Sequence, residues 1–434
     1  MSDLIDELEK KIKGREAKIG IMGMGYVGIP LGLEFAGTGF SVTGFDKDSN
    51  RVKEINSGKQ VMKHIPAKSM KEFVKKNKGS ATNKFSEIGD MDCLIICVPT
   101  PLDEHEQPDM SYIESASKEI GKSLRKGQLI VLESTTYPGT TREIVKPILE
   151  RSKLKAGEDF FLAYSPERED PGNKEFSVSA IPKVMGGLTD DCLRLTSNLY
   201  KNIVSETVEV SSLETAEATK LMENIFRAVN IAMVNELKLV LSRMGVNIWE
   251  VIDAAKTKPF GFMPFYPGPG MGGHCIPIDP FYLSWKAKEY NTEAKFIELA
   301  GEINRKMTEN IAHRIGRALN DDKKSVRDSK ILIVGVAYKK DVDDMRESPA
   351  LRIMNLLEYK GAKINYHDPY VERVGSLKNL DLTKNTIEEQ DAIVITTDHT
   401  SIDYLLLGKH AKLIVDTRNI MATVKNPKAR VIRA

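Results

Sequence analysis

The chain of 434 residues has little cysteine, no excess of charge of either sign and no long apolar run. Four cysteines are too few for the disulfide framework of a small secreted domain. The 63 Lys and Arg residues nearly balance the 61 Asp and Glu residues, giving a net charge of +2. This balance does not favour nucleic acid or an anionic membrane as a partner. No apolar run approaches the roughly 18 residues that a membrane span needs.

The N-terminal sequence MSDLIDELEKKIKGREAKIG is acidic from the start and lacks the apolar core of a signal peptide. We therefore expect a soluble, cytoplasmic protein whose partner is a small polar molecule, with neither nucleic acid nor membrane involved. A chain of this length predicts about two to three domains, each large enough to bury its own core.

A segment near the N-terminus has the pattern of a dinucleotide-binding turn. An apolar strand precedes Gly23, Gly25 and Gly28, a helical pattern follows them, and the next strand ends at Asp46. Glycines let the backbone approach a pyrophosphate at a helix N-terminus, and a carboxylate accepts hydrogen bonds from ribose hydroxyls. We predict NAD as the cofactor, because Asp46 would repel the 2′-phosphate of NADP. Arg51, five positions further on, weakens that preference.

Apolar strands and helical patterns alternate in two parts of the chain. After the glycine turn, DCLIICVPT and GQLIVLEST predict further strands, so we expect a doubly wound parallel sheet. A second alternation of strand and helix patterns begins near residue 329 with KILIVGVAY and continues through AKINYHDP, QDAIVITT and AKLIVDTRN. This second region lacks the glycine fingerprint and has Lys339 and Lys340 at the turn after its first strand. These are either solvated lysines or the ammonium groups of a nucleotide pocket.

Between the two regions of alternating strands and helices, SLETAEATKLMENIFRAVNIAMVNELKLVLSRMGV predicts one helix of about 30 residues. Such a helix, apolar on more than one face, spans between domains or packs on a partner subunit. Lys220, Asn224 and Arg227 form one polar line on it, which is either solvated charge or functional. The predicted fold is α/β, with two Rossmann-like doubly wound parallel-sheet domains joined by a helical connector. The expected domains are residues 1–208, 209–315 and 316–434.

Cys275 differs from the other three cysteines. Cys93 and Cys97 lie in a strand pattern and Cys192 in a helical pattern, where cysteine acts as a small buried hydrophobe. Cys275 lies beside His274 in GPGMGGHCIPIDPFYL, a run so rich in Gly and Pro that we expect neither helix nor strand there. No second pair of ligands at zinc-site spacing accompanies it, so we predict no metal. A loop with so restricted a backbone path suggests that the thiol is used.

Six motifs together resemble the UDP-glucose/GDP-mannose dehydrogenase family, whose members oxidise C6 of a nucleotide sugar from alcohol to carboxylate. In the family's order they are GMGYVG, ESTTYPGT, YSPERED, EATKLMENIFRAVN, GMGGHCIPIDP and GVAYKKDVDDMRES, so the resemblance covers nearly the whole chain. It implies a four-electron oxidation in which the thiolate of Cys275 forms a thiohemiacetal that becomes a thioester. The glycine-rich approach would supply backbone amides that favour the thiolate.

The resemblance also implies roles for other residues. Lys220 would be the cation that stabilises oxyanion character, and Asn224 would donate a hydrogen bond to the same centre. Asp279 would hold a water or the lysine within the proton-transfer machinery. Glu167 would activate water for hydrolysis of the thioester, and Thr135 would contact both the cofactor and that water.

Further matches imply contacts to the cofactor and to the substrate. The cofactor-side residues are Gly23, Gly25, Tyr26, Val27, Gly28, Asp46, Arg51, Thr100, Thr135 and Arg346. The substrate-side residues are Arg168, Glu169, Lys220, Asn224, Arg227, Phe265, Tyr266, Gly272, Lys339 and Arg418. Lys339 matches the lysine that contacts the nucleotide sugar, Arg346 the arginine that reaches the NAD pyrophosphate, and Arg418 an arginine on the UDP side. The run PEREDPG departs from the Pro-Glu-Phe-Leu-Arg-Glu-Gly run of the UDP-glucose branch, which leaves Glu169 a weak candidate.

The runs SPEREDPGN and KPFGFMPFYPGPG resemble the branch that acts on UDP-N-acetylhexosamines. Phe260, Phe262, Phe265 and Tyr266 would form an aromatic wall for a base or an acetamido methyl, or would simply pack. We predict UDP-N-acetylglucosamine as the substrate and a homodimer through the central helix.

Other readings stay open. UDP-N-acetylmannosamine and UDP-glucose differ from the predicted substrate only at C2, and the sequence does not show the pocket that would distinguish them. A two-electron dehydrogenase of the 6-phosphogluconate or 3-hydroxyacid type would share the first domain and the long helix but would have no need of Cys275. A silent nucleotide-sugar sensor would have no reason to keep a nucleophile.

Overall fold

The computed structural model describes residues 2–62, 65–75, 79–168, 178–273 and 276–434. It divides into two compact units. Unit 1 comprises Met1–Glu223 and Phe281–Thr292, and unit 2 comprises Asn224–Pro280 and Glu293–Ala434. Helices α8 (Leu213–Arg243) and α10 (Asp279–Glu289) each run from one unit into the other.

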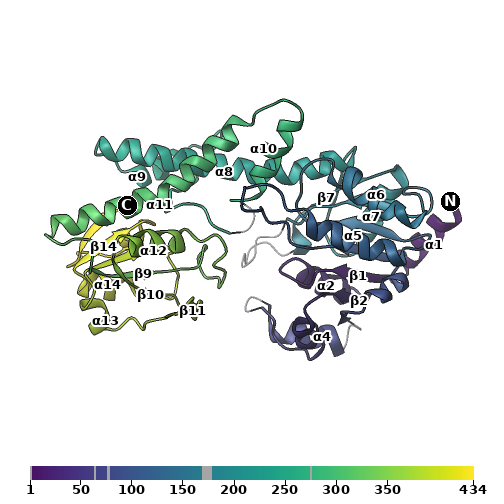
Figure 1. Ribbon diagram of the computed structural model, residues 1–434, viewed down its shortest axis with the longest axis horizontal. Helices are drawn as coiled ribbons and strands as arrows, with labels where there is room; N and C mark the ends of the chain where they lie inside the picture. The colour runs from purple at the N-terminus through teal and green to yellow at the C-terminus, as the bar shows by residue number, and fades with distance from the viewer. Residues whose placement is uncertain (1, 63–64, 76–78, 169–177, 274–275) are drawn as a thin grey trace. The chain divides into compact units, whose positions relative to one another are not determined.

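Unit 1 is built on an eight-stranded sheet with the order β3-β2-β1-β4-β5-β6-β7-β8. Strands β1, β2 and β7 of this sheet are labelled in Figure 1. Its strands are β1 (Lys18–Met22), β2 (Ser41–Phe45), β3 (Gly79–Thr82), β4 (Cys93–Ile96), β5 (Leu129–Leu132), β6 (Phe161–Tyr164), β7 (Lys183–Gly187) and β8 (Thr207–Glu209). The six strands from β3 to β6 pair in parallel, and only β6 with β7 pairs antiparallel. The strand order reverses between β1 and β4, and sheets of this kind bind ligands at the carboxyl ends of the strands beside such a reversal.

Helices cover both faces of this sheet. They are α1 (Ser2–Lys13), α2 (Gly28–Gly37), α3 (Ser49–Asn56), α4 (Ala67–Lys75), α5 (Ser111–Ser123), α6 (Lys146–Leu149) and α7 (Asp190–Tyr200), with short turns η1 (Phe85–Asp90), η2 (Thr141–Val145), η3 (Glu150–Ser152) and η4 (Val178–Ala180). Ile95 of β4 packs with α1, α2, α4 and α7, whereas its neighbours Leu94 and Ile96 pack with α5, α6 and the start of α8. Successive side chains of a strand point to opposite faces, so both faces are buried and the predicted doubly wound sheet is confirmed.

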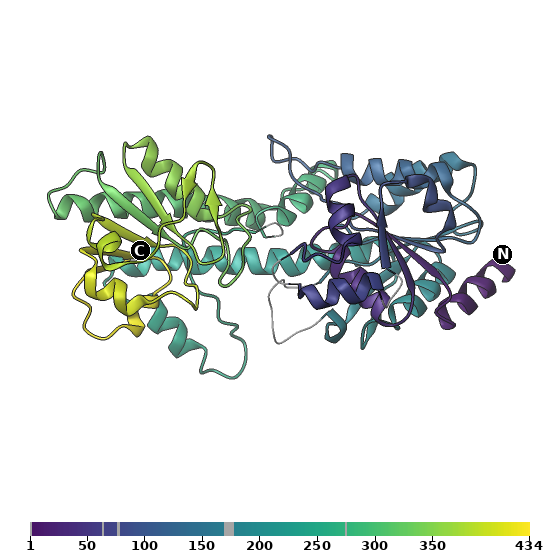
Figure 2. The same cartoon turned by 90° about the horizontal axis from the view of Figure 1, so that it is seen from below.

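The sequence patterns did not predict helix α1. Ile5, Leu8 and Ile12 recur at helical spacing, and all three are buried against the core that includes α7. The ribbon of α1 lies at the N-terminal end of the chain and contacts α7 (Figures 1 and 2). Asn198 of α7 also donates to Glu9 Oε1 over 3.0 Å. The acidic N-terminal segment is therefore an integral part of unit 1.

Unit 2 contains a smaller, wholly parallel sheet with the order β10-β9-β13-β14-β15. Its strands are β9 (Lys330–Val334), β10 (Lys363–His367), β13 (Ala392–Ile395), β14 (Leu413–Asp416) and β15 (Arg430–Arg433), with a separate ribbon of β11 (Arg373–Val374) and β12 (Leu377–Lys378). Its helices are α9 (Ile248–Ala255), α11 (Lys295–Asp321), α12 (Pro349–Tyr359), α13 (Lys384–Glu388), α14 (Tyr404–His410) and the turn η5 (Ile420–Thr423). Helices α11 and α12 cover one face, and α13, α14 and η5 cover the other. This confirms the second Rossmann-like sheet.

The long central helix is confirmed as α8, with 31 residues. One expectation was wrong: the end of the glycine-rich run is helical, because α10 begins at Asp279. Pro280 lies in the first turn of α10, where the missing N–H costs no hydrogen bond. Cys93, Cys97 and Cys192 are buried, as predicted. No helix in the described part of the chain is long and apolar enough to cross a membrane.

Candidate active site

Several predicted cofactor and catalytic residues of unit 1 follow the ends of successive parallel strands. Gly23 follows β1, Asp46 follows β2, Thr100 follows β4, Thr135 follows β5 and Glu167 follows β6. The carboxyl ends of parallel strands meet at one edge of a sheet, which is where such folds bind nucleotides. The fold therefore brings these residues to the same edge.

The glycine turn after β1 is shaped for a close approach to its backbone. Gly23 has φ +96°, in the left-handed region that favours glycine. A Cβ at Gly28 would lie 1.9 Å from the carbonyl oxygen of Gly23, so only glycine fits there. A Cβ at Gly25 would have no atom within 4 Å, which leaves the backbone open at that point. Tyr26 and Val27 complete the turn and are half-buried.

The acidic residue after β2 is fixed by backbone amides. Asp46 is half-buried and accepts from the amides of Met24 and Asp48, each at 2.9 Å. Asp48 caps α3 and accepts from the amide of Arg51. The Nη1 atom of Arg51 is buried and has no hydrogen-bond partner in the described part of the chain. An open glycine turn, a positioned carboxylate and this buried nitrogen fit a bound NAD molecule.

A buried cluster of charged side chains lies at the ends of β5, β6 and β7. Lys220 Nζ is 3.5 Å from Glu167 Oε2, with side chains 6% and 13% exposed. Lys183 Nζ is 2.9 Å from Glu133 Oε2, with side chains 10% and 1% exposed. Burial raises the pKa of Glu167, Lys220 and Lys183 counteract this, and the negative charge of Glu133 adds to it. A carboxylate whose pKa is raised is a stronger base than an ordinary glutamate, which suits it to removing a proton.

The structure adds buried acids that sequence reasoning missed. Glu133 directly follows β5 and accepts from the hydroxyl of Tyr200. Glu217 on α8 is fully buried and accepts from the amides of Gly139 and Thr141 at 2.6 and 2.8 Å. These bonds fix α8 to the segment that follows Thr135. In the sequence, Glu133 could have been recognised as a glutamate at the end of a predicted strand, and Glu217 as a glutamate one helical turn before Lys220.

Arg168 is engaged within unit 1. Its Nη2 atom donates to Glu223 Oε1 and its Nη1 atom to the carbonyl oxygen of Pro182, both over 2.6 Å. Glu169, His274 and Cys275 lie outside the described residues, so the predicted roles of Glu169 and Cys275 stay predictions.

In unit 2 the side-chain amide of Asn224 donates to Asp279 Oδ2 over 2.6 Å. Both side chains are buried, and Asp279 is the first residue of α10. Arg227, the third member of the predicted polar line, is exposed. The line therefore divides into two buried side chains, Lys220 and Asn224, and one solvated charge.

The glycine-rich loop packs closely against the carboxyl edge of the small sheet. A Cβ at Gly268 would lie 2.8 Å from Arg418 Nη1, and one at Gly272 would lie 2.7 Å from Tyr338 Cβ. Tyr338 precedes Lys339 in the loop after β9. The glycines thus allow the loop to touch both predicted UDP-side regions.

Two predicted arginines are held by specific acceptors. Arg418 follows β14 and donates from Nε to the carbonyl oxygen of Thr396 over 2.9 Å. Arg346 forms a fork with Asp344, with Nη2 2.7 Å from Oδ2, and its side chain is 44% exposed. Both guanidinium groups have defined positions beside the small sheet.

The four aromatic residues of 260–266 do not form a single cluster. Phe265 packs edge-on against Phe226, with 5.7 Å between ring centroids. Tyr266 stacks on Trp249 at 5.6 Å and donates its hydroxyl to Asp253 over 2.8 Å. Phe260 and Phe262 are exposed. Packing on α8 and α9 accounts for Phe265 and Tyr266. Among the described residues, no group of three or more His, Cys, Asp and Glu side chains is placed to hold a metal ion.

A doubly wound unit with a dinucleotide turn, a long helix and a second doubly wound unit together define a nucleotide-binding α/β protein of the dehydrogenase type. The chain belongs to the UDP-glucose/GDP-mannose dehydrogenase family. The family's NAD binding domain matches residues 17–204, its central domain residues 214–306 and its UDP binding domain residues 332–423. The predicted family, fold and cofactor are thereby confirmed.

Relatives with two different sugar specificities match the chain almost equally well. A UDP-N-acetyl-D-glucosamine 6-dehydrogenase of Pseudomonas aeruginosa is 34% identical over 418 residues, covering 94% of this chain and 98% of that protein. A UDP-N-acetyl-D-mannosamine dehydrogenase of Pyrococcus horikoshii is 35% identical over 410 residues, covering 93% and 96%. A solved structure of the UDP-D-ManNAc dehydrogenase from Pyrococcus horikoshii superposes with a TM-score of 0.87 at 35% identity, covering 96% of this chain and 99% of that one. This chain is therefore a nucleotide-sugar dehydrogenase with a UDP-sugar substrate.

Proposed function

We propose that this protein oxidises the C6 hydroxyl of a UDP-N-acetylhexosamine to the carboxylate, with UDP-N-acetylglucosamine as its preferred substrate. The observation that carries the proposal is the pair of buried polar contacts made by α8. Lys220 is paired with Glu167, and one turn later Asn224 is bound to Asp279. Burying such groups costs free energy unless they are paired, and their pairing matches the roles that the family resemblance implies.

In the proposed reaction, the thiolate of Cys275 adds to the C6 aldehyde made by the first oxidation. The resulting thiohemiacetal loses a second hydride to become a thioester, and water releases the acid and the thiol. NAD supplies the hydride acceptor for both oxidations. The overall balance is one alcohol, one water and two NAD⁺ giving one carboxylate, two NADH and three protons.

The side chains have separate tasks in this proposal. The ammonium group of Lys220 stabilises the developing oxyanion, and Asn224 donates to the same oxygen. Asp279, held by Asn224, takes part in proton transfer. Glu167, whose pKa is raised chiefly by burial, removes a proton from the water that attacks the thioester. Thr135 contacts that water.

We retain the division into an NAD domain (1–208), a helical connector (209–315) and a UDP-sugar domain (316–434). NAD is assigned to the glycine turn, Asp46, Arg51, Thr100 and Arg346, and the nucleotide sugar to Lys339, Arg418 and the loop through Gly272. A cytoplasmic location follows from the proposed substrate.

The choice of sugar rests on a narrow difference. UDP-N-acetylmannosamine is the second candidate, because the Pyrococcus horikoshii relative named for it covers the chain equally well. The two sugars differ only in configuration at C2.

The proposal is tested by turnover of UDP-N-acetylglucosamine, UDP-N-acetylmannosamine and UDP-glucose with NAD by the purified protein. We expect two NADH for each sugar consumed, a uronate product by mass spectrometry, and the highest kcat/KM for UDP-N-acetylglucosamine. A higher kcat/KM for one of the other sugars would reassign the substrate. One NADH per sugar would favour a two-electron dehydrogenase, and binding without turnover would favour a sensor.

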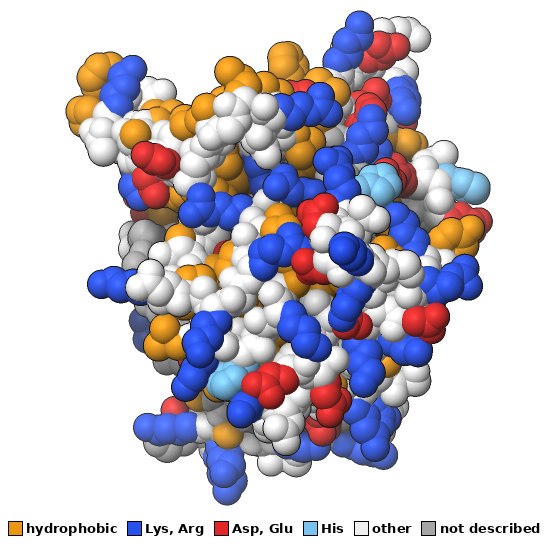
Figure 3. Space-filling view, turned by 90° about the vertical axis from the view of Figure 1, so that its left-hand side faces the viewer, with side chains coloured by type: hydrophobic (Ala, Val, Ile, Leu, Met, Phe, Trp, Pro, Cys, Tyr) orange, Lys and Arg blue, Asp and Glu red, His pale blue; other side chains and the backbone are white. Residues whose placement is uncertain are grey.

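The exposed surface of α8 supports a homodimer. Large apolar side chains recur along the helix and are between 42% and 65% exposed: Met222, Phe226, Met233, Leu237 and Val240. Figure 3 shows hydrophobic side chains along the upper edge of that view, and Figure 1 has the labels of α8 and α9 at its upper edge. An apolar helix face of this length in water favours a self-complementary contact with a second copy.

Light scattering coupled to gel filtration tests the dimer. We expect the parent protein to have twice the mass of the chain, and Leu237→Glu to shift it toward the monomer. Tyr359→Glu on α12, which replaces another exposed side chain, is the matched control. A monomeric parent protein would contradict the proposed assembly.

A further inference from the structure

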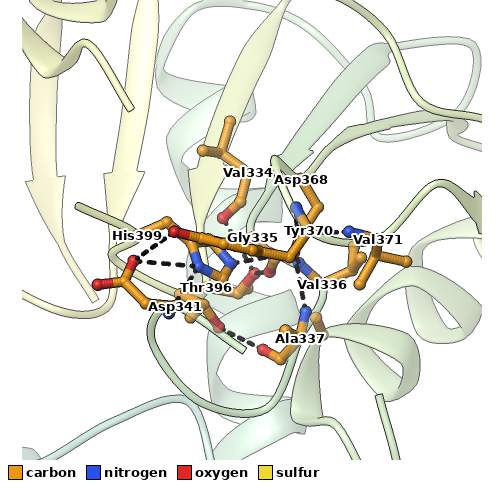
Figure 4. Close-up of polar contacts among 12 residues, drawn as sticks. Val334, Gly335, Val336, Ala337, Asp341, Asp368, Tyr370, Val371, Thr396 and His399 are labelled. Atoms are coloured by element: carbon orange, nitrogen blue, oxygen red, sulfur yellow. Dashed lines mark hydrogen bonds and ion pairs between the residues drawn. The ribbon is translucent and has the colours of Figure 1, made fainter. Parts of the chain in front are cut away.

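A single buried pair of side chains, Asp368 and His399, holds both ends of the loop that carries Lys339 (Figure 4). His399 Nε2 lies 3.0 Å from Asp368 Oδ2, and neither side chain has any exposed surface. Neither residue belongs to the site that the family resemblance implies.

The beginning of the loop is bound to the carboxylate. The backbone amides of Val336 and Ala337 donate to Asp368 Oδ2 over 2.7 and 3.0 Å. The other oxygen accepts from the amides of Tyr370 and Val371 over 2.8 and 3.0 Å. Four amides and one imidazole therefore surround this carboxylate.

The end of the loop is bound to the imidazole. The amide of Asp341 donates to His399 Nδ1 over 3.0 Å. Because Nδ1 accepts, the ring proton lies on Nε2 and is donated to Asp368. Asp341 has φ +59°, a left-handed conformation that a residue with a Cβ adopts only when its surroundings impose it. The carboxylate of Asp341 accepts from the amide and the hydroxyl of Thr400, over 2.8 and 2.5 Å.

Asp368 occupies in unit 2 the position that Asp46 occupies in unit 1. Asp46 directly follows β2, the neighbour of β1, and Asp368 directly follows β10, the neighbour of β9. Asp46 accepts from the amide of Met24, the second residue after β1, and Asp368 accepts from the amide of Val336, the second residue after β9. Asp46 is half-buried, whereas Asp368 is fully buried. The acid of the second unit therefore has no surface left for ribose hydroxyls and serves to hold the loop.

We propose that His399 is a positioning residue for the nucleotide sugar. By holding Asp341 in place, it sets the conformation of loop 336–341 in which Lys339 meets the diphosphate of a uridine diphosphate sugar. This inference rests on the proposed function, since that function assigns Lys339 to the nucleotide sugar.

Two isosteric variants separate the two hydrogen bonds of the imidazole. In His399→Asn the side-chain oxygen takes the place of Nδ1 and still accepts from Asp341, whereas in His399→Gln the side-chain nitrogen takes the place of Nε2 and still donates to Asp368. We expect His399→Gln to weaken UDP binding about 10-fold, as for the loss of one buried hydrogen bond, and His399→Asn to weaken it less than about 3-fold. The KM for the sugar should rise with little change in the KM for NAD.

The control is His410→Gln, a histidine on α14 that contacts Glu388 over 3.0 Å. We expect this variant to bind UDP as the parent protein does. Thermal melting of each variant, together with NAD binding measured by calorimetry, shows that unit 1 remains folded.

A double-mutant cycle tests whether His399 acts through Lys339. If it does, UDP should bind to Lys339→Ala/His399→Gln no more weakly than to Lys339→Ala alone. Additive losses, or UDP binding within 2-fold of the parent for His399→Gln, would overturn the inference. Failure of the parent protein to bind UDP would instead overturn the proposed function.

Discussion

The side-chain amide of Asn224 donates to the carboxylate of Asp279 over 2.6 Å, although the two residues are 55 positions apart in the chain. Asn224 belongs to the middle of the long helix α8, and Asp279 begins α10. Both side chains are buried, so solvent does not compete for this bond. One oxygen of the proposed proton-transfer carboxylate is thereby oriented by a neutral donor.

Replacing Asn224 with Asp should place two buried carboxylates in contact, and their repulsion should raise the pKa at which the pair takes up a shared proton. We expect kcat at neutral pH to fall about 10- to 100-fold, the range for a lost hydrogen bond to a charged group. Activity relative to the parent should recover as the pH is lowered, because the shared proton restores a hydrogen bond. The matched control is Asn230→Asp on the same helix, where the amide donates to an exposed carbonyl of Phe226. A ratio of activities that is constant with pH would contradict this assignment.

Replacing Asp46 with Ala should weaken NAD binding by about 1–3 kcal/mol, because a charge-assisted hydrogen bond to the ribose is lost. The same change should improve NADP relative to NAD, since the repulsion of the 2′-phosphate disappears. Asp48→Ala is the control, because Asp48 caps α3 and contacts the amides of Asn50 and Arg51. It should lower stability by about 1 kcal/mol and leave cofactor preference unchanged. Preference of the parent protein for NADP would refute the role of Asp46.

The buried pair Lys183 and Glu133 should tune Glu167 in opposite directions. Burial is the main cause of the raised pKa of Glu167, Lys183 lowers that pKa and Glu133 raises it. A base works only as the carboxylate, so the acid limb of the pH profile of kcat rises as pH passes through this pKa. Glu133→Gln should therefore move the acid limb to lower pH, and Lys183→Met should move it to higher pH.

The control for this pair is Lys126→Met, which removes a surface cation that contacts Asp159 over 2.8 Å. We expect its pH profile to match that of the parent protein, because exposed charges are screened by solvent. Shifts of the acid limb in the same direction for both buried variants would show that Glu167 does not respond to this pair.

Replacing Cys275 with Ala should abolish net acid formation, because no thiohemiacetal forms. Cys275→Ser offers a hydroxyl with a far higher pKa than a thiol, so it should form the aldehyde reversibly and stall before the second oxidation. With Glu167→Gln, which slows hydrolysis, acid-quenched enzyme should carry a sugar-nucleotide adduct on the peptide that contains Cys275. Full activity of the alanine variant would leave this cysteine as loop packing. Cys192→Ala, at a buried position in α7, is the control.

Periodicity along the sequence predicted the repeating elements. The apolar runs that became β1, β4, β9 and β13 are buried on both faces, and runs of this kind are recognisable without neighbours. Helix α8 was also predictable, because few residues interrupt its apolar spacing. The elements α11 and β15 were not predicted, since their helical or extended state is stabilised by packing within unit 2 that the local sequence does not show. Helix α1 was missed although Ile5, Leu8 and Ile12 recur at helical spacing.

The sequence by itself determined the cofactor, through three glycines at a strand end and an acid after the next strand, and it determined the family through its six motifs. The tertiary structure decided which polar residues are buried together. Lys183 with Glu133, and Asp368 with His399, are pairs from separate strands and loops whose contact depends on strand order. Spacing along a chain carries no information on such contacts, because they arise only when the sheet brings distant strand ends to one edge.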